Sequence, residues 1–266
     1  MNRPFRQVVI MLLGICGLAS CHNITTVTPT EVASERVRDP DPILPIYEVL
    51  RTTGPIQIDG RAEESDWDRA GAVEFIFPWN DVEKEGKQGT VARMLWDDSN
   101  LYIVYVCEDP YLHSEVVDHD GPVYEEDAVE IFATPNPNDL TAYYGYEMNI
   151  NGALLDYIAF DAGEHRTESI HFGWQSEGVL IATTYDGTLN KHEDIDTGWV
   201  LEIAIPFDNF RNLGGQVPPE EGDLWRINLN RTKGDLGQFS QWSDTRAEVP
   251  SFHHSHFFGR VYFSHK

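Results

Sequence analysis

The chain has 266 residues, enough for one large domain or two small ones, and 41% of them are apolar. Its 44 acidic residues outnumber its 19 lysines and arginines and give a formal net charge of −25. This balance argues strongly against nucleic acid as a partner, because neutralising phosphates requires lysine and arginine. The charge suits a neutral ligand or Ca²⁺, which takes oxygen ligands, and it equally suits a surface whose charge serves solubility alone.

Residues 1–20 predict an export signal. Arg3 and Arg6 supply its positive start, and the apolar run over residues 8–18 is too short to span a bilayer as a mature helix. The signal ends in Leu18-Ala19-Ser20-Cys21, which resembles a bacterial lipobox and implies cleavage before Cys21 and lipid attachment to its sulfur. An ordinary secretory signal with a chance cysteine is the alternative.

A lipid on Cys21 would tether the mature protein to a membrane without spanning it. His22 stands where an aspartate would signal retention in the inner membrane, so we expect a lipid-anchored protein of the cell envelope, on the outer membrane. Residues 21–44 are rich in Thr, Pro, Val and charge, which indicates a linker. The folded domain is expected over residues 45–266.

Of the three cysteines, only Cys107 belongs to this domain, because Cys16 is lost with the signal and Cys21 carries lipid. No intrachain disulfide is therefore expected, even in an oxidising compartment. Cys107 ends the apolar stretch 101–107, which favours a buried structural thiol over a nucleophile.

Two hairpins are predicted within the domain. Residues 90–96 alternate well, and the apolar stretch 101–107 follows as the partner strand after an Asp-Asp-Ser-Asn turn signal. Residues 144–150 and 153–160 flank Asn151-Gly152, a favoured two-residue turn.

The remaining elements are short, and no long helical period occurs. Trp67 is the expected buried anchor of one helical turn over residues 63–70. The other predicted strands are residues 56–60, 124–132, 169–174, 179–185, 198–207, 225–231 and 257–263. Many short strands separated by turn signals predict an all-β fold, an antiparallel and jelly-roll-like β-sandwich with short helical turns.

The stretch 124–132 combines an acidic start with a β-prone end. In a strand, Val129 and Ile131 would face one way, and Glu130 and Phe132 would face the other. A carboxylate in such an apolar run requires a reason, since burying an unpaired charge is costly. A polar groove with an aromatic rim would supply that reason, whereas an edge strand with a solvated glutamate is the alternative.

Several segments, in their order and spacing, resemble the family 9 carbohydrate-binding modules over about residues 46–264. The resemblance implies a β-sandwich that binds sugars without cleaving them, often beside glycoside hydrolases, with structural Ca²⁺ in some members. The matching segments are Ile58-Asp59-Gly60 with Trp67 downstream, Leu95-Trp96-Asp97-Asp98, residues 126–132, the strand with Asn149, Gly198-Trp199 with Glu202, Trp225-Arg226-Ile227-Asn228, Trp242-Ser243-Asp244 and Phe258-Gly259.

The resemblance implies a sugar site in a slot between two aromatic rings. The first ring falls on Tyr124 and the second on Phe252, where members with a characterised slot carry tryptophan. Glu130 matches the glutamate that accepts hydrogen bonds from sugar hydroxyls, and Asn149 and Trp242 complete the expected carbohydrate-binding set. Packing in the core or in a loop is the alternative for the two rings.

Two positions depart from the family pattern. An arginine that members use at the site falls near Glu147, and the asparagine before the second ring has no clear match near Val249. The resemblance therefore implies the location of the slot more directly than the identity of its sugar.

Metal sites are the next candidates. Asp118 and Asp120 lie in an oxygen-rich turn that suits structural calcium, although their spacing matches no EF-hand loop. The run His253-His254-Ser255-His256 would suit a transition metal, since imidazoles two apart in a strand share a face. A solvated loop is the alternative for this run.

No catalytic residue and no organic cofactor are predicted. The sequence contains no Gly-x-Ser-x-Gly, His-Glu-x-x-His, phosphate-loop or Cys-x-x-Cys motif. A glycosidase needs two facing carboxylates, but with 44 acidic residues some pair will face by chance.

We therefore expect a non-enzymatic, membrane-anchored lipoprotein that holds polysaccharide or oligosaccharide in an aromatic slot and supports carbohydrate catabolism. Its expected partners are a glycan and a glycoside hydrolase or uptake system, with membrane contact through the lipid alone. One alternative is a haem-binding electron-transfer domain on a similar sandwich, with Met94 or Met148 as an axial ligand. A protein-interaction subunit is the other alternative.

Overall fold

Alternating apolar and polar side chains give this chain many short strands and few helical segments. The computed structural model describes residues 43–160, 170–234 and 237–266, which belong to the compact unit Pro42–Lys266. The strands are β1 (Ile46–Arg51), β2 (Val73–Glu74), β3 (Thr90–Trp96), β4 (Asn100–Glu108), β5 (Asp127–Thr134), β6 (Ala142–Asn149), β7 (Leu154–Phe160), β8 (Ile170–His171), β9 (Leu180–Asp186), β10 (Gly198–Pro206), β11 (Leu224–Lys233), β12 (Gln238–Gln241) and β13 (Gly259–Ser264). The helical segments are α1 (Ser65–Arg69), α2 (Val82–Glu85), η1 (Val123–Glu125), η3 (Phe207–Leu213) and η4 (Ser255–Phe257).

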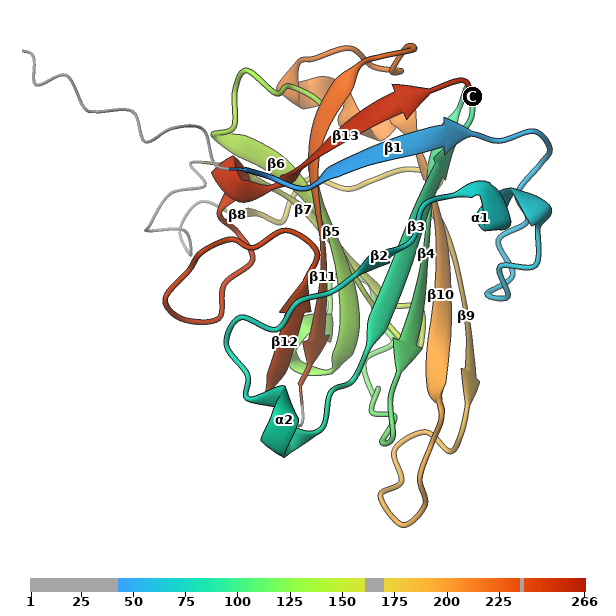
Figure 1. The fold of residues 1–266 in the computed structure, drawn as a ribbon, viewed down its shortest axis with the longest axis vertical. Helices are drawn as coiled ribbons and strands as arrows, with labels where there is room; N and C mark the ends of the chain where they lie inside the picture. The colour runs from blue at the N-terminus through green and yellow to red at the C-terminus, as the bar shows by residue number, and fades with distance from the viewer. Residues whose placement is uncertain (1–42, 161–169, 235–236) are drawn as a thin grey trace, which may run out of the picture. The chain divides into compact units, whose positions relative to one another are not determined.

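The described strands form one mixed sheet that curls on itself (Figure 1). Their order is β8-β7-β6-β5-β11-β13-β1-β3-β4-β10-β9, with β12 beside β11 and β2 beside β3. β1 runs parallel to β13 and β3, while the hairpin-connected neighbours are antiparallel. The curl brings β5, β6, β7 and β11 opposite β3, β4, β9 and β10, which confirms the predicted sandwich of mainly antiparallel strands.

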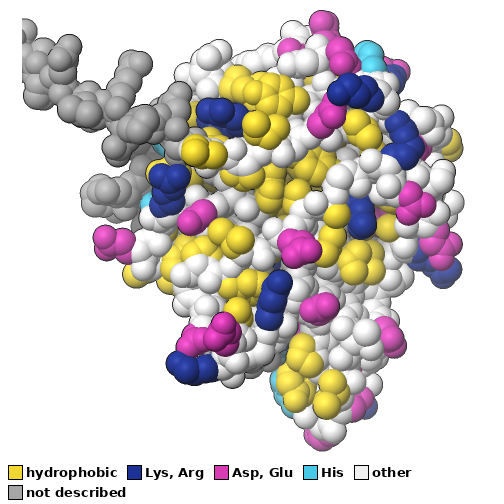
Figure 2. Space-filling view, viewed as in Figure 1, with side chains coloured by type: hydrophobic (Ala, Val, Ile, Leu, Met, Phe, Trp, Pro, Cys, Tyr) yellow, Lys and Arg dark blue, Asp and Glu magenta, His cyan; other side chains and the backbone are white. Residues whose placement is uncertain are grey.

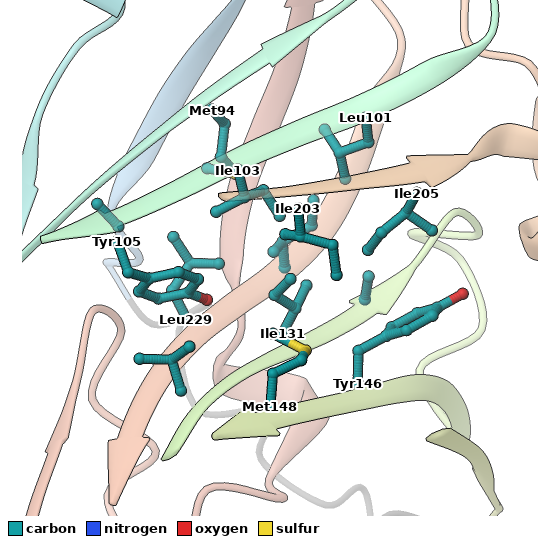
Figure 3. Close-up of a cluster of buried hydrophobic side chains, with 14 of the residues drawn as sticks. Met94, Leu101, Ile103, Tyr105, Ile131, Tyr146, Met148, Ile203, Ile205 and Leu229 are labelled. Carbon is teal, nitrogen blue, oxygen red and sulfur yellow. The ribbon is translucent and has the colours of Figure 1, made fainter. Parts of the chain in front are cut away.

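The two layers meet in one main apolar core (Figure 3). Ile103 of β4 and Ile203 of β10 face Ile131 of β5 and Met148 of β6, and all four are fully buried. Full burial of such a side chain contributes about 1.5–3 kcal/mol, more than an exposed ion pair. The contact between the layers is therefore the main source of stability in this sandwich.

The sulfur-containing side chains for which the sequence predicted a role lie in this core. Cys107 is a buried free thiol, and burial raises its pKa to about 11, which confirms the structural role expected from the sequence. Met94 and Met148 are both fully buried among apolar side chains, which does not favour an axial role on haem for either.

Both predicted hairpins are confirmed. β3 and β4 pair in antiparallel register across the Asp-Asp-Ser-Asn turn. β6 and β7 pair around Asn151-Gly152, where Gly152 has a φ of +75° that favours glycine. The predicted strand over residues 169–174 is shorter in the structure, and only β8 pairs there.

The prediction of a strand over residues 56–60 is wrong. Backbone N–H groups that would pair with a neighbouring strand donate instead to the buried side chain of Glu202. The Glu202 Oε2 atom accepts hydrogen bonds from the backbone N–H groups of Asp59, Gly60 and Arg61 at 3.1, 2.7 and 3.2 Å. Its Oε1 atom accepts from the indole N–H of Trp67 at 3.2 Å, which anchors α1 as the sequence predicted. Two further short strands, β1 and β12, were not predicted from the sequence. β1 pairs with β13 and β3, and β12 pairs with β11.

The face of the molecule in Figure 2 shows acidic side chains interspersed with lysines, arginines and apolar side chains. None of the helices in the described ranges is long and apolar enough to cross a membrane. The predicted export signal, the predicted lipidation site Cys21 and the part of the predicted linker up to residue 42 lie outside the described residues.

Replacing Glu202 by glutamine should destabilise the fold by about 2 kcal/mol, because the amide supplies one neutral acceptor where four donors meet a carboxylate. Urea unfolding measures this loss as a lower free energy of unfolding. Glu193→Gln, an exposed glutamate in the β9–β10 connection, is the matched control. Equal stability of the two variants would contradict the proposed structural role of Glu202.

Candidate functional site

The outer face of β5, β6, β7 and β11 points away from the main core and carries a second apolar cluster. Phe132 of β5, Tyr143 of β6 and Tyr157 of β7 are buried members of this cluster. Phe252 and Phe258 join it from the segment between β12 and β13. The strand alternation therefore separates the predicted site residues of β5 from the core between the layers.

Two glutamates lie beside this cluster. Glu130 of β5 and Glu147 of β6 are cross-strand partners, and each is at most 5% exposed. Glu130 accepts a hydrogen bond from Thr232 Oγ1 at 3.1 Å and a long one from Asn230 Nδ2 at 3.5 Å. Glu147 Oε1 accepts from the Tyr157 hydroxyl at 2.8 Å. The predicted Glu130 is thus one member of a buried polar group, rather than a solvated glutamate on an edge strand.

This polar group has unused hydrogen-bonding capacity. Glu147 Oε2 and Asn230 Oδ1 are buried, and neither has a hydrogen-bond partner among the described residues. An unsatisfied buried polar atom costs about 1–3 kcal/mol. A ligand that brings hydroxyl donors to these two acceptors would recover that cost.

Burial raises the pKa of both glutamates. The pKa of Glu147 rises to about 7 through burial, partly offset by the hydrogen bond from Tyr157. Burial and the neighbouring Glu147 raise the pKa of Glu130 well above its ordinary value. Interacting carboxyls titrate as a pair, so near pH 7 this pair retains a proton and offers a donor as well as acceptors.

The two predicted aromatic rings differ in exposure. Tyr124, in η1, is 47% exposed, whereas Phe252 is only 6% exposed. The Phe252 ring packs against Trp79 and Phe239, with ring centroids 5.6 and 6.2 Å away. Trp79 Nε1 in turn donates to the Ala247 carbonyl at 2.8 Å, which ties this aromatic group to the loop that carries Phe252. Tyr124 is therefore the ring that is free to stack on a ligand.

The backbone around Tyr124 is held from both sides. Val123 is fully buried in the second apolar cluster. Gly234 approaches η1 so closely that an added Cβ would lie 2.0 Å from the Glu125 carbonyl oxygen. The Glu126 carboxylate accepts from the backbone N–H groups of Glu115 and Val116, each at 2.8 Å. These contacts fix the position of the exposed ring.

Asn149 and Trp242 have packing roles that do not present them to a ligand. Asn149 Nδ2 donates to the Val116 carbonyl at 2.8 Å and to Glu126 at 2.9 Å, and its Oδ1 accepts from Ala153 N at 3.0 Å. Trp242 lies in the main core, in edge contact with Tyr47. Glu130 and Phe252 thus lie on the outer face and Tyr124 lies in η1, which contacts β5 and β6, whereas the other two predicted residues pack within the fold.

A buried ionic network anchors the segment that leads to this face. Lys233 Nζ lies 2.7 Å from Asp127 Oδ2 and 3.3 Å from Asp109 Oδ1, and Arg231 lies 2.9 Å from Asp109 Oδ2. Burial, followed by the nearby Asp109, raises the pKa of Asp127 to about 7, against the lowering effect of Lys233. The network joins the end of β4 and the start of β5 to β11.

The structure separates the two predicted calcium ligands. Asp118 is exposed and stands outside any metal-binding group among the described residues, whereas Asp120 lies with His119 and Asp156. An imidazole in the donor set fits Ca²⁺ poorly, because Ca²⁺ prefers six to eight oxygen ligands.

The histidine run is dispersed as well. His253 stacks on Phe132, His254 Nδ1 contacts the Thr245 carbonyl, and the His256 carbonyl accepts from Arg226. The three imidazoles therefore have different surroundings and do not form one metal site.

Sequence reasoning missed Trp79, Phe239 and Asn230 as members of this face. The aromatic stretch 75–79 was a signal for Trp79, but its distance in sequence from Phe252 hid the contact. The pairing of β11 with β5 places Asn230 opposite Glu130, and this register depends on the assembled sheet.

The geometry has parallels among known proteins. A family model described as carbohydrate family 9 binding domain-like matches residues 58–266. Exoglucanase XynX of Acetivibrio thermocellus is 28% identical over 160 residues, which is 60% of this chain and 12% of that protein. Endo-1,4-beta-xylanase A of Thermotoga neapolitana is 44% identical over 152 residues, which is 57% of this chain and 12% of that protein. The match therefore spans only a small part of these curated relatives.

Two solved structures share the fold. A proposed carbohydrate-binding protein from Bacteroides uniformis has a TM-score of 0.67 at 20% identity, covering 83% of this chain and 99% of that one. A carbohydrate-binding module of family 9 from Caldicellulosiruptor kristjanssonii, in complex with cellotriose, has a TM-score of 0.55 at 17% identity. It covers 83% of this chain and 94% of that one.

Glu147→Gln should raise the free energy of unfolding at pH 8 by an amount on the order of 2 kcal/mol, and much less near pH 4. The folded-state pKa of Glu147 is raised from 4.5 to about 7, so the folded protein holds a proton that the unfolded chain releases. The stability associated with that proton is present at low pH and is lost as pH rises through the folded pKa. Glutamine keeps the acceptor for Tyr157 and does not ionise.

Urea unfolding at pH 4, 6 and 8 measures this difference. Glu83→Gln, an exposed glutamate in α2, should follow the wild type at each pH. A Glu147→Gln variant that loses the same stability at every pH would contradict the raised pKa.

Proposed function

Because this chain belongs to the carbohydrate family 9 binding domain-like family, we propose that the outer face around Tyr124, Glu130 and Phe252 binds a neutral oligosaccharide or polysaccharide without cleaving it. One observation carries the proposal: the exposed ring of Tyr124 belongs to η1, which contacts β5 and β6, and these two strands carry a buried glutamate pair with an unused acceptor. The family membership supports carbohydrate as the ligand class.

The two parts of the face suit the two sides of a pyranose. The ring of Tyr124 would pack against the apolar C–H face, a contact of about 1 kcal/mol by analogy with aromatic pairs. Hydroxyl groups would donate to Glu147 Oε2 and Asn230 Oδ1 once the side chains that cover these buried atoms move aside. A hydrogen bond to the carboxylate contributes about 1.5–3 kcal/mol where Glu147 is ionised, above its pKa of about 7. Such a sum supports dissociation constants in the micromolar to millimolar range.

The face departs from the family's slot in ways that affect its selectivity. Tyrosine and phenylalanine replace the two tryptophans of characterised members, and Phe252 is mostly covered by Trp79 and Phe239. Glu147 occupies the region of an arginine, so this face carries two carboxyls where the family pattern pairs a carboxylate with a cation. Sugars that donate several hydroxyls should therefore bind better here than sugars with anionic substituents.

The proposed setting is the cell envelope. The lipobox-like Leu18-Ala19-Ser20-Cys21 supports a lipid anchor on Cys21, and His22 supports the outer membrane. The similar segments of the exoglucanase and the xylanase make up 12% of those longer proteins. This likeness supports a role beside polysaccharide-degrading enzymes or an uptake system in carbohydrate catabolism.

Tyr124→Ala should weaken sugar binding about fivefold, the equivalent of a stacking contact of about 1 kcal/mol, and should leave unfolding unchanged because the ring is exposed. A glycan array identifies the ligand, with glucose and cellotriose as starting probes because family 9 modules have been solved with both. Titration calorimetry then compares the wild type with the variant.

The matched control is Tyr185→Ala, a tyrosine of similar exposure on β9 in the opposite layer. It should bind like the wild type. Equal loss in both variants, or no binding to any glycan on the array, would count against the proposed face.

The lipid anchor has its own test. Cys21→Ser should move the protein from the detergent phase to the aqueous phase in a detergent partition of expressing cells, because the thiol that carries the lipid is gone. Cys16→Ser, which alters a cysteine within the predicted signal, should leave the partition unchanged. An identical partition of wild type and Cys21→Ser would rule out the anchor.

A further inference from the structure

A small group of ligating side chains lies apart from the proposed sugar face. His119 and Asp120 belong to the segment between β4 and η1, and Asp156 belongs to β7. One potential ligand atom from each of the three lies within 4.8 Å of the others. The Asp120 backbone N–H donates to the Leu154 carbonyl at 2.9 Å, which holds the segment against β7.

The carboxylate of Asp156 is the unusual member, because it is fully buried and only half satisfied. Its Oδ2 atom accepts from the Ser176 backbone N–H at 3.0 Å and from the Ser176 hydroxyl. Its Oδ1 atom is buried and has no hydrogen-bond partner among the described residues. A cation at this oxygen would provide the compensation that a buried carboxylate requires.

The other two ligands open to solvent, so an ion can enter. The His119 and Asp120 side chains are 48% and 35% exposed, and His119 Nε2 lies 3.7 Å from Asp120 Oδ1. Gln175 bridges the same two residues, since its Nε2 donates to Asp120 Oδ2 at 2.8 Å and its Oε1 meets His119 Nε2. The amide of Gln175 therefore supplies a fourth potential ligand atom, an oxygen, at the group.

The donor chemistry selects the class of ion. Imidazole nitrogen and carboxylate oxygens in a small set suit Zn²⁺, which takes four ligands, better than Ca²⁺, which takes six to eight oxygens. We propose that His119, Asp120 and Asp156 bind a divalent transition-metal ion of the Zn²⁺ type, with Gln175 Oε1 or water as the fourth ligand. This site uses Asp120 but not Asp118 of the predicted calcium pair.

The bound ion would act as a clamp. It joins the segment ahead of η1 to β7 and, through Gln175, to the residues after β8. These elements are far apart in sequence, and the ion would add to the contacts that already join them, such as Ser176 with Asp156 and Gln175 with Asp120. The competing explanation is a buried water between Asp156 and Tyr146, its cross-strand partner, whose hydroxyl is also buried without a partner in the described structure.

The test uses the full chain after removal of metals with EDTA and dialysis. Titration calorimetry with ZnCl₂ should show one equivalent bound, and His119→Ala and Asp156→Asn should each weaken binding at least tenfold. Asp118→Asn, a neighbouring exposed carboxylate outside the group, should bind within twofold of the wild type. Zn²⁺ at a hundredfold excess over its dissociation constant should raise the wild-type Tm by roughly 5 °C, with a much smaller rise for His119→Ala.

Three results would overturn the proposal. The first is no Zn²⁺ binding by the stripped protein, which is the outcome that a bridging water predicts. The second is binding that His119→Ala leaves unchanged. The third is stabilisation by CaCl₂ but not by ZnCl₂, especially if Asp118→Asn abolishes it. Because His119 is exposed, its alanine variant should fold, and its Tm without metal checks this directly.

Discussion

A buried ionic network of Lys233, Arg231, Asp109 and Asp127 anchors the segment that leads to the proposed ligand-binding face. Removing one partner from such a network leaves an uncompensated buried charge, which typically costs about 3–5 kcal/mol. Asp109 lies just after β4 and Asp127 begins β5, so the network fixes both ends of the segment between them. That segment carries Tyr124 and His119, and the ionic network adds to the hydrogen bonds of Glu126 with Glu115 and Val116 that hold the segment from within.

Successive side chains of β5 point alternately into the core between the layers and to the outer side of the sheet. Val129 and Ile131 pack in the core between the layers, while Glu130 and Phe132 face the outer side. The two sides are also linked, since the Tyr105 hydroxyl in the core donates to the Glu130 carbonyl at 2.8 Å. The packed core therefore fixes the position of the β5 backbone that carries Glu130. An acceptor with a defined position requires such a rigid backbone.

Both proposed sites contain buried acceptor atoms that have no hydrogen-bond partner among the described residues. Glu147 Oε2 and Asn230 Oδ1 on the outer face, and Asp156 Oδ1 beside β7, are buried acceptors without partners in the described structure. Most buried polar atoms in proteins are paired, so each exception requires an explanation. In the two proposals, hydroxyl donors of a sugar would pair with the first two atoms, and a cation would pair with the third. Both explanations assign part of the stability of the domain to its ligands.

The sequence by itself determined the β-sandwich, both hairpins and the side of β5 to which Glu130 belongs, because these follow from local alternation and turn chemistry. It also located Tyr124 and Phe252 through a family resemblance. Only the tertiary structure decided that the Asn149 side chain is used in hydrogen bonds within the fold and that Asp120 lies beside His119 and Asp156. The same holds for the strand predicted over residues 56–60, whose backbone donors are taken by Glu202. Each of these outcomes depends on a hydrogen bond or contact between residues far apart in sequence. Local sequence patterns do not determine which distant side chain reaches a given polar atom.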